Sequence, residues 1–267
     1  IRDSLKEVTL ALHLHHDARN MMPPGVSGTA TFGIPIYTPN AELSFLVRIL
    51  PYIEQVSLYN RCDLTKGFLN APYTTAVNGV TINGTRISSF LCPSAVSVVS
   101  EYAAQAGITT HIYGVLGPRG TNPATGSLYR FYDDTTSPPS GPSHGWIPKQ
   151  GILGINSNIP LSKVTDGTST TLMIGELSWK DANCYRPWTR GWEGNASGTA
   201  KTTLYAINST SYNGADNFNH VTFGSQHGGG AGFGFADGAV TFINESIDLV
   251  TYNSLSSRDG GERVARP

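Results

Sequence analysis

The chain has 267 residues, and its 18 Lys and Arg against 19 Asp and Glu give a formal net charge of −1. No basic run longer than two residues occurs, so the sequence offers no electrostatic surface for nucleic acid, and we expect no nucleic-acid partner. Charged residues make up 14% of the chain, well below the usual proportion of about a quarter. Ser, Thr, Asn and Gly take their place, which is typical of β-rich secreted or surface-exposed proteins.

The first segment, residues 1–19, has the pattern of an amphipathic helix. The predicted buried stripe consists of Ile1, Leu5, Val8, Leu12 and His16, widened by Leu10 and Leu14. Pro23-Pro24-Gly25 prevents the helix from continuing. The chain begins without Met inside this helix, so we expect that an upstream segment has been removed. His13 and Asp17, spaced i and i+4, could share a metal ion, but a single pair of this kind is a weak signal.

Residues 41–61 form a second helical segment, which Pro51 should kink or divide. A long stretch rich in Gly, Pro, Ser and Thr, residues 118–148, reads as an insertion that carries a contact surface or is mobile. The remaining predicted elements are a hairpin or loop at 74–86, a helical turn at 161–165, and short strands at 101–113, 147–155 and 170–176.

Residues 223–245, FGSQHGGGAGFGFADGAVTFINE, predict a β-hairpin. His227 and the following glycines form a loop, and Asp237-Gly238 joins two apolar runs. Such a pair predicts a type I′ turn, in which both central residues have positive φ. Small residues alternate with Phe233 and Phe235, which indicates either that another element packs closely over one face or that the backbone approaches a neighbour. His227 is a candidate ligand or base, or else a loop residue with a satisfied hydrogen bond.

The three cysteines, Cys62, Cys92 and Cys184, have no metal-type CxxC spacing. In an oxidising compartment Cys62 and Cys92 are the disulfide candidate, with Cys184 free; the alternative is three unpaired thiols. No stretch approaches the ~20 apolar residues of a membrane span. No signal peptide is evident.

Several acidic residues lie beside predicted turns. Asp166-Gly167 and Asp237-Gly238 occupy turns, and Glu176 ends a strand, so Asp166, Asp237 and Glu176 are calcium candidates. The alternative is that both Asp residues accept hydrogen bonds from their own turn amides, while Glu176 and His227 hold the Gly-rich loop against the sheet. No other cofactor is expected. The sequence contains no GxSxG, HExxH or P-loop motif, so we expect no enzymatic activity.

Six stretches of the chain resemble, in the same order, large pilin-like proteins that are abundant in planctomycetes. These proteins carry a domain of unknown function that has sometimes been labelled solute-binding. The hallmark of the group is a His followed by nine residues and Asp-Gly, which His227, Asp237 and Gly238 fit. The stretches are residues 10–25, 48–60, 87–94, 164–176, 223–248 and 255–262.

The resemblance implies an α+β, pilin-like fold in which an N-terminal helix packs on a mainly antiparallel sheet with long loop insertions. Residues 1–22 would be the C-terminal half of the spine helix, whose apolar half is missing, and residues 23–267 a single head domain. The group is similar to bacterial type IV pilins and type II secretion pseudopilins, which have a prepilin-type leader.

The implied role is that of a non-catalytic structural subunit of a cell-envelope filament or secretion apparatus. Its head would be periplasmic or extracellular, and the full-length protein would be anchored in the inner membrane. Partners would be copies of itself, other pilin-like subunits and the assembly machinery. The alternative is an extracellular module that binds glycans or envelope polymers, with stacking platforms supplied by Trp146, Trp179, Trp188 and Trp192.

Overall fold

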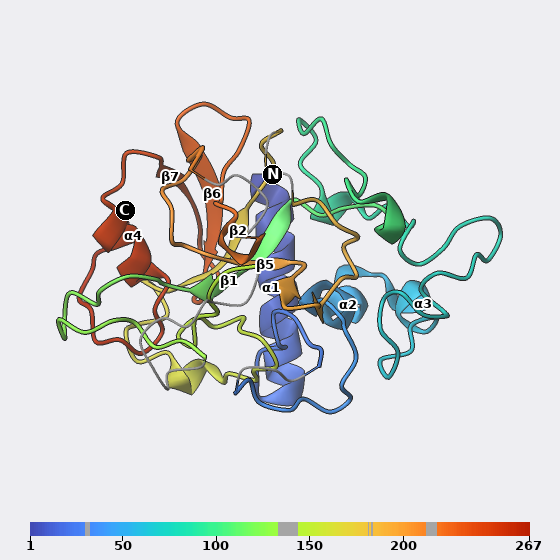
Figure 1. Cartoon of the computed structure of the whole chain (residues 1–267), viewed down its shortest axis with the longest axis horizontal. Coiled ribbons are helices and arrows are strands. Elements are labelled where there is room, and N and C mark those ends of the chain that lie inside the picture. The colour runs from blue at the N-terminus through green and yellow to red at the C-terminus, as the bar shows by residue number, and fades with distance from the viewer. Residues whose placement is uncertain (30–32, 133–143, 181, 183, 212–217) are drawn as a thin grey trace.

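The protein is described by a computed structural model that covers residues 1–29, 33–132, 144–180, 182, 184–211 and 218–267. Four α-helices and seven strands occur in this part of the chain, joined by long irregular segments (Figure 1). The helices are α1 (Arg2–Arg19), α2 (Phe45–Ile49), α3 (Val56–Tyr59) and α4 (Leu249–Leu255), and the 3₁₀ turns are η1 (Leu50–Ile53), η2 (Ser88–Phe90), η3 (Ala103–Gln105), η4 (Leu161–Lys163) and η5 (Phe218–His220). The strands are β1 (Ile112–Gly117), β2 (Leu172–Glu176), β3 (Trp192–Glu193), β4 (Ala196–Ser197), β5 (Ala200–Thr202), β6 (Gly230–Phe235) and β7 (Val240–Asn244).

The main sheet has five strands in the order β5-β1-β2-β6-β7. Three of its four neighbouring pairs are antiparallel, and the β1–β5 pair is parallel. A separate two-stranded sheet is formed by β3 and β4. The α+β class and the mainly antiparallel sheet expected from the sequence are therefore confirmed, with one parallel pair at an edge.

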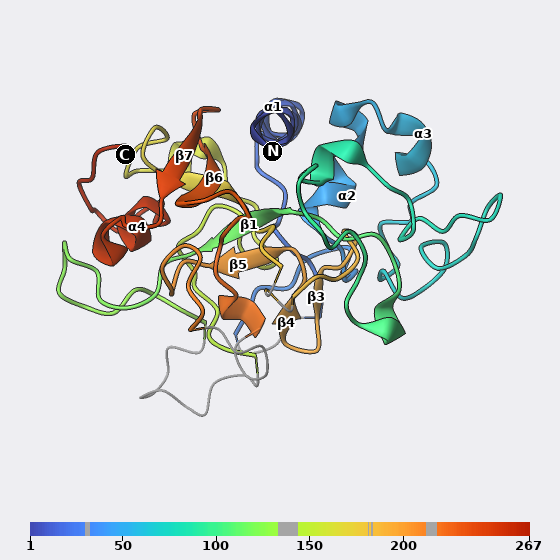
Figure 2. The ribbon, with the colours of Figure 1, turned by 90° about the horizontal axis from the view of Figure 1, so that it is seen from above.

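Helix α1 lies across one face of this sheet, and Figure 2 shows it end-on at the outside of the molecule. The contact surface on β6 is made of glycines: a Cβ placed on Gly232 would lie 2.6 Å from Leu5 Cδ1, and one on Gly234 would lie 2.5 Å from Thr9 Oγ1. The prediction that another element packs closely over the small residues of the hairpin is thus confirmed. That element is the N-terminal helix.

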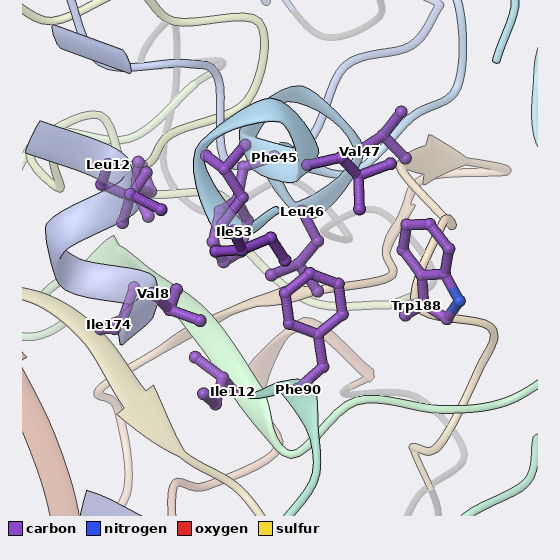
Figure 3. Packing of buried hydrophobic residues seen from close by; sticks show 14 of the residues in the cluster. Val8, Leu12, Phe45, Leu46, Val47, Ile53, Phe90, Ile112, Ile174 and Trp188 are labelled. Carbon is purple, nitrogen blue, oxygen red and sulfur yellow. The ribbon is translucent and has the colours of Figure 1, made fainter. Parts of the chain in front are cut away.

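The side chains of β6, those of Ala231, Phe233 and Phe235, all lie on the face opposite α1 and alternate with glycines on the helix face, as the two-residue period of a strand requires. On the helix side, Val8 and Leu12 of α1 pack with Ile174 of β2, and this core continues under α2 (Figure 3). On the opposite side, the ring of Phe233 lies 5.5 Å from that of Phe223 and 5.8 Å from that of Tyr252 in α4. The sheet therefore separates two cores, each of which holds both aliphatic and aromatic side chains.

The stripe predicted for α1 is confirmed at Leu5, Val8 and Leu12, which are fully buried. The widening by Leu10 and Leu14 is wrong, because these side chains are 59% and 40% exposed on the outer face of the helix. Leu10 and Leu14 are four residues apart, so their side chains lie on the same face of the helix, here the outer one.

Among the other local predictions, some are confirmed and some are wrong. The division of the second helical segment at Pro51 is confirmed, because α2 passes directly into η1 there. The strand predicted at 147–155 is wrong. The amide of Gly151 donates to Leu116 O and the carbonyl of Gly154 accepts from Gly25 N, so this buried segment satisfies its backbone against two different neighbours. The predicted insertion 118–148 includes residues 133–143, which lie outside the described residues.

The hairpin itself is confirmed, but its predicted type I′ turn is wrong. Gly238 has a φ of 93°, whereas Asp237 does not have a positive φ. The amide of Gly238 donates to Phe235 O and that of Phe235 to Ala239 O, the pattern of a three-residue loop with a glycine bulge. A two-residue turn with positive φ at both positions occurs instead at Asn78-Gly79, with φ of 55° and 80°.

In the described part of the chain, none of the helices has the length and apolar character needed to cross a lipid bilayer.

We predict that Gly234→Val destabilises the protein by about 1–3 kcal/mol, because the new side chain collides with Thr9 of α1 and with Ile174 of β2. Thr9→Ala removes the oxygen nearest to the new Cβ, so the double variant should lose less than the sum of the single losses. Urea unfolding of the four chains measures this coupling. Gly228→Ala is the control, since no atom lies within 4 Å of a Cβ at that position. Additive losses would show that the helix does not press on this glycine.

His220 predicts an acid dependence of stability. Its Nε2 accepts from Trp146 N, its Nδ1 pairs with Thr202 Oγ1, and burial lowers its pKa to about 3. The unfolded chain binds the proton at about pH 6.5, so the free energy of unfolding should fall as the pH drops from about 6.5 towards 3. His220→Gln should reduce this slope by up to about 1.4 kcal/mol per pH unit. Urea unfolding of both chains at pH 8, 6 and 4 measures the two slopes. At pH 8 the histidine is neutral in the folded and the unfolded chain, so the difference there gives the effect of the substitution itself. An unchanged slope would contradict the prediction.

Candidate functional site

Glu176 is a buried carboxylate at the end of strand β2. The sheet register pairs it with Ile112 of β1, and its side chain has no exposed surface. One carboxylate oxygen, Oε1, accepts a hydrogen bond of 2.7 Å from Ser178 Oγ, and Oε2 accepts one of 3.2 Å from Gly232 N. These two donors fix the carboxylate at the junction of β2 and β6.

His227 lies in the loop before β6 and reaches the same carboxylate. The amide of Gly224 donates to the backbone oxygen of Glu176, which brings the loop to the end of β2. Ser225 Oγ accepts from the amide of His227 and bonds to Gly230 O, so it closes the loop. Nε2 of His227 lies 3.8 Å from Glu176 Oε1, and the His227 side chain is 40% exposed.

Cys92 completes the group from a third segment, just after η2. Its amide donates to Nδ1 of His111, which precedes β1. The other nitrogen of His111 lies 2.7 Å from Ser97 O, and burial lowers the pKa of His111 to about 4, so the ring is neutral and can accept at Nδ1. Cys92 Sγ lies 3.5 Å from His227 Nε2.

The Cys92, Glu176 and His227 side chains therefore form one cluster, called here the thiol–imidazole–carboxylate cluster. Their sulfur, nitrogen and oxygen atoms all lie within 4.8 Å of one another. The same nitrogen, Nε2, faces both Cys92 and Glu176. A nucleophile–base–acid triad uses the two ring nitrogens separately, one for the nucleophile and one for the acid. The geometry consequently suits three donors that converge on one ion, or a thiol hydrogen bond to the ring, better than a catalytic relay.

The predicted Cys62–Cys92 disulfide is wrong, because all three cysteines are free thiols. Cys62 Sγ donates to Leu58 O, and Cys184 lies 3.9 Å from the hydroxyl of Tyr113. Burial raises the pKa of both Cys62 and Cys184 to about 11, which keeps these thiols protonated and unreactive. Cys92 differs from them in having an imidazole and a carboxylate beside its sulfur.

Asp166 and Asp237 do not join Glu176 in a calcium site. Asp166 accepts from the amides of Gly260 and Gly261, at 2.6 and 2.9 Å, so it holds the C-terminal segment. Gly167 follows it with a φ of 105°. The expectation that Asp166 binds amides of its own turn is thus also wrong. Among the described residues, the only close group of three metal-ligating side chains is the thiol–imidazole–carboxylate cluster.

Asp237 accepts a hydrogen bond from an amide of its own turn, as the alternative to a calcium site predicted. Its carboxylate accepts a 3.0 Å hydrogen bond from Ala239 N in its own turn, and it also pairs with Arg266. His13 of α1 lies beside this turn, next to Gly238. His227 and Asp237-Gly238 thus lie at opposite ends of β6, and the motif marks the two ends of one strand.

The four tryptophans do not form a shared stacking platform. Trp188 and Trp192 are core residues with 0% and 1% exposure. Trp146 packs edge-on against Phe131. Trp179 donates from its ring nitrogen to Thr222 O and lines an open hollow beside His227.

Residues 2–250 match the sequence profile of a family described as protein of unknown function (DUF1559). The match covers most of the chain, so the protein belongs to this family. Neither the curated proteins nor the solved structures include a match to the chain.

The sequence singled out each member of the cluster and placed Glu176 near His227, but it did not bring Cys92 to them. Glu176 and His227 were placed at the Gly-rich loop, and the expectation that they lie near each other is supported by their 3.8 Å separation. Cys92 was assigned to another partner, because no spacing rule links a cysteine to a histidine 135 positions away.

Proposed function

We propose that the chain is the head and the adjoining helix of a pilin-like or pseudopilin-like subunit of a bacterial cell-envelope assembly, with a structural and non-catalytic role. The observation that carries the proposal is the placement of α1. The helix is buried along one side by its own sheet and is open along the other (Figure 2). A subunit that packs helix against helix in a filament needs one side of its helix buried on its own sheet and the other side free to contact a neighbour.

The open side of α1 has the chemistry of a packing surface. Leu10 and Leu14 are exposed there and follow one stripe with Asp3, Glu7 and Asp17. Apolar residues in such a stripe favour association with a second helix, and the flanking charges favour a defined register. On this proposal the partners are other pilin-like subunits, and the native protein is anchored in the inner membrane by further helix upstream.

A catalytic role has less support. Among the described residues, the thiol–imidazole–carboxylate cluster presents the same histidine nitrogen to its thiol and to its carboxylate, so the carboxylate does not orient the ring as the acid of a catalytic triad does. The glycan-binding alternative has no specific support either, because two of the four tryptophans belong to the core.

The proposal predicts subunit contacts through Leu10. We expect that a photo-crosslinking amino acid at position 10, in cells that make the protein from its native gene, yields a ladder of covalent multimers. The same substitution at Leu128 is the matched control, since this leucine is 65% exposed but lies on a loop outside α1. Western blots of envelope fractions measure the ladder.

A second variant separates assembly from folding. Leu10→Asp with Leu14→Asp should abolish the multimers while leaving the melting temperature within a few degrees of the wild type, since both side chains are exposed. Multimers that form equally through positions 10 and 128, or that survive the double substitution, would contradict the proposal.

A further inference from the structure

We propose that Cys92, Glu176 and His227 bind a zinc ion. The three side chains come from three separate segments, yet their Sγ, Oε1 and Nε2 atoms converge within 4.8 Å. This inference does not depend on the pilin-like role, because it requires only residues of the described chain.

Two of the three distances between the ligand atoms are close to those of a tetrahedral zinc centre, and the third, between Cys92 and Glu176, is within 4.8 Å. Bond lengths of about 2.3 Å to sulfur and about 2.05 Å to nitrogen place these two ligands about 3.5 Å apart at a tetrahedral angle. The distance from Cys92 Sγ to His227 Nε2 is 3.5 Å. A nitrogen and an oxygen ligand should be about 3.4 Å apart, and the distance from His227 Nε2 to Glu176 Oε1 is 3.8 Å. A small rotation of the half-exposed imidazole closes the difference.

The charge balance of the site also favours a cation. Glu176 is fully buried, and in the described part of the chain the only basic side chain within 4 Å of its carboxylate is that of His227. Burying a carboxylate without a full positive charge beside it is costly. A divalent ion would neutralise both the carboxylate and the Cys92 thiolate.

Neighbouring groups hold the ligands in place, as outer-shell partners do in metal sites. Ser178 Oγ and Gly232 N fix the Glu176 carboxylate, and the neutral His111 ring accepts from the Cys92 amide. Three protein ligands leave one coordination position for water, and His227 is open to solvent on its exposed side.

The donor set selects the metal class. A thiolate and an imidazole are soft and borderline ligands that favour zinc, whereas calcium and magnesium require oxygen ligands. Cys92 Sγ and Glu176 Oε1 both face Nε2 of His227. Ligands of a shared ion have this arrangement, whereas a proton relay uses the two ring nitrogens separately.

Cobalt(II) titration of the reduced, metal-free protein tests the proposal, with zinc as competitor. We expect one cobalt per chain, a thiolate-to-metal charge-transfer band, visible bands of tetrahedral intensity, and displacement by one equivalent of zinc. Cys92→Ser should abolish the charge-transfer band. His227→Gln should weaken binding at least 100-fold, and Ser178→Ala about 10-fold.

Matched controls use the other thiols and another imidazole. Cys62→Ser, Cys184→Ser and His13→Gln should keep the full cobalt spectrum and stoichiometry. His227→Gln is the decisive variant: relative to the metal-free melting temperature of the same chain, zinc should raise the melting temperature of the wild type and leave that of the variant unchanged. Absence of cobalt uptake, or a spectrum that persists in both Cys92→Ser and His227→Gln, would overturn the proposal and leave the cluster as a thiol hydrogen bond.

Discussion

The close approach of helix α1 to strand β6 is the contact on which the rest of the fold depends. Four residues of an α-helix rise about 6.0 Å, and two residues of a strand rise about 6.7 Å. Leu5 and Thr9 can therefore follow Gly232 and Gly234 in step. A side chain at either glycine would lift the helix and open the core beneath it. The alternate residues of the strand are free to be large, and the rings of Phe233 and Phe235 pack into the core on the far side.

The same strand explains the spacing of the family motif. His227 lies just before β6 and Asp237-Gly238 just after it, so the nine intervening residues span one crossing of the sheet. Each end is tied to a different part of the molecule: His227 faces Glu176, and Asp237 pairs with Arg266 near the C-terminus. The spacing of the motif therefore reflects the length of β6, and His227 and Asp237 contact different parts of the molecule.

Elements with local signals could be predicted from the sequence. The amphipathic period gave α1, Pro51 divided the second helical segment, and Asp-Gly marked the hairpin. The turn type was missed because Asp237 keeps a negative φ when a bulge at Gly238 completes the turn. Helix α4 was missed although Asp248 caps it by accepting from Thr251 N. Cys92 was misassigned because its neighbours depend on sheet register and on the ring of His111, which no local pattern encodes.

The separation of Cys92 and His227 along the chain has a consequence for biogenesis. Their side chains meet only after a loop spanning 135 positions has closed, and such non-local contacts form late because the entropy of closure is lost before the contact is made. Glu176 must also be in register with β1 by then. The zinc ion proposed for this cluster requires all three ligands, so it would bind the folded protein and not nascent or partly collapsed chains. Binding of the ion would therefore stabilise only correctly folded chains and make them more resistant to unfolding and proteolysis.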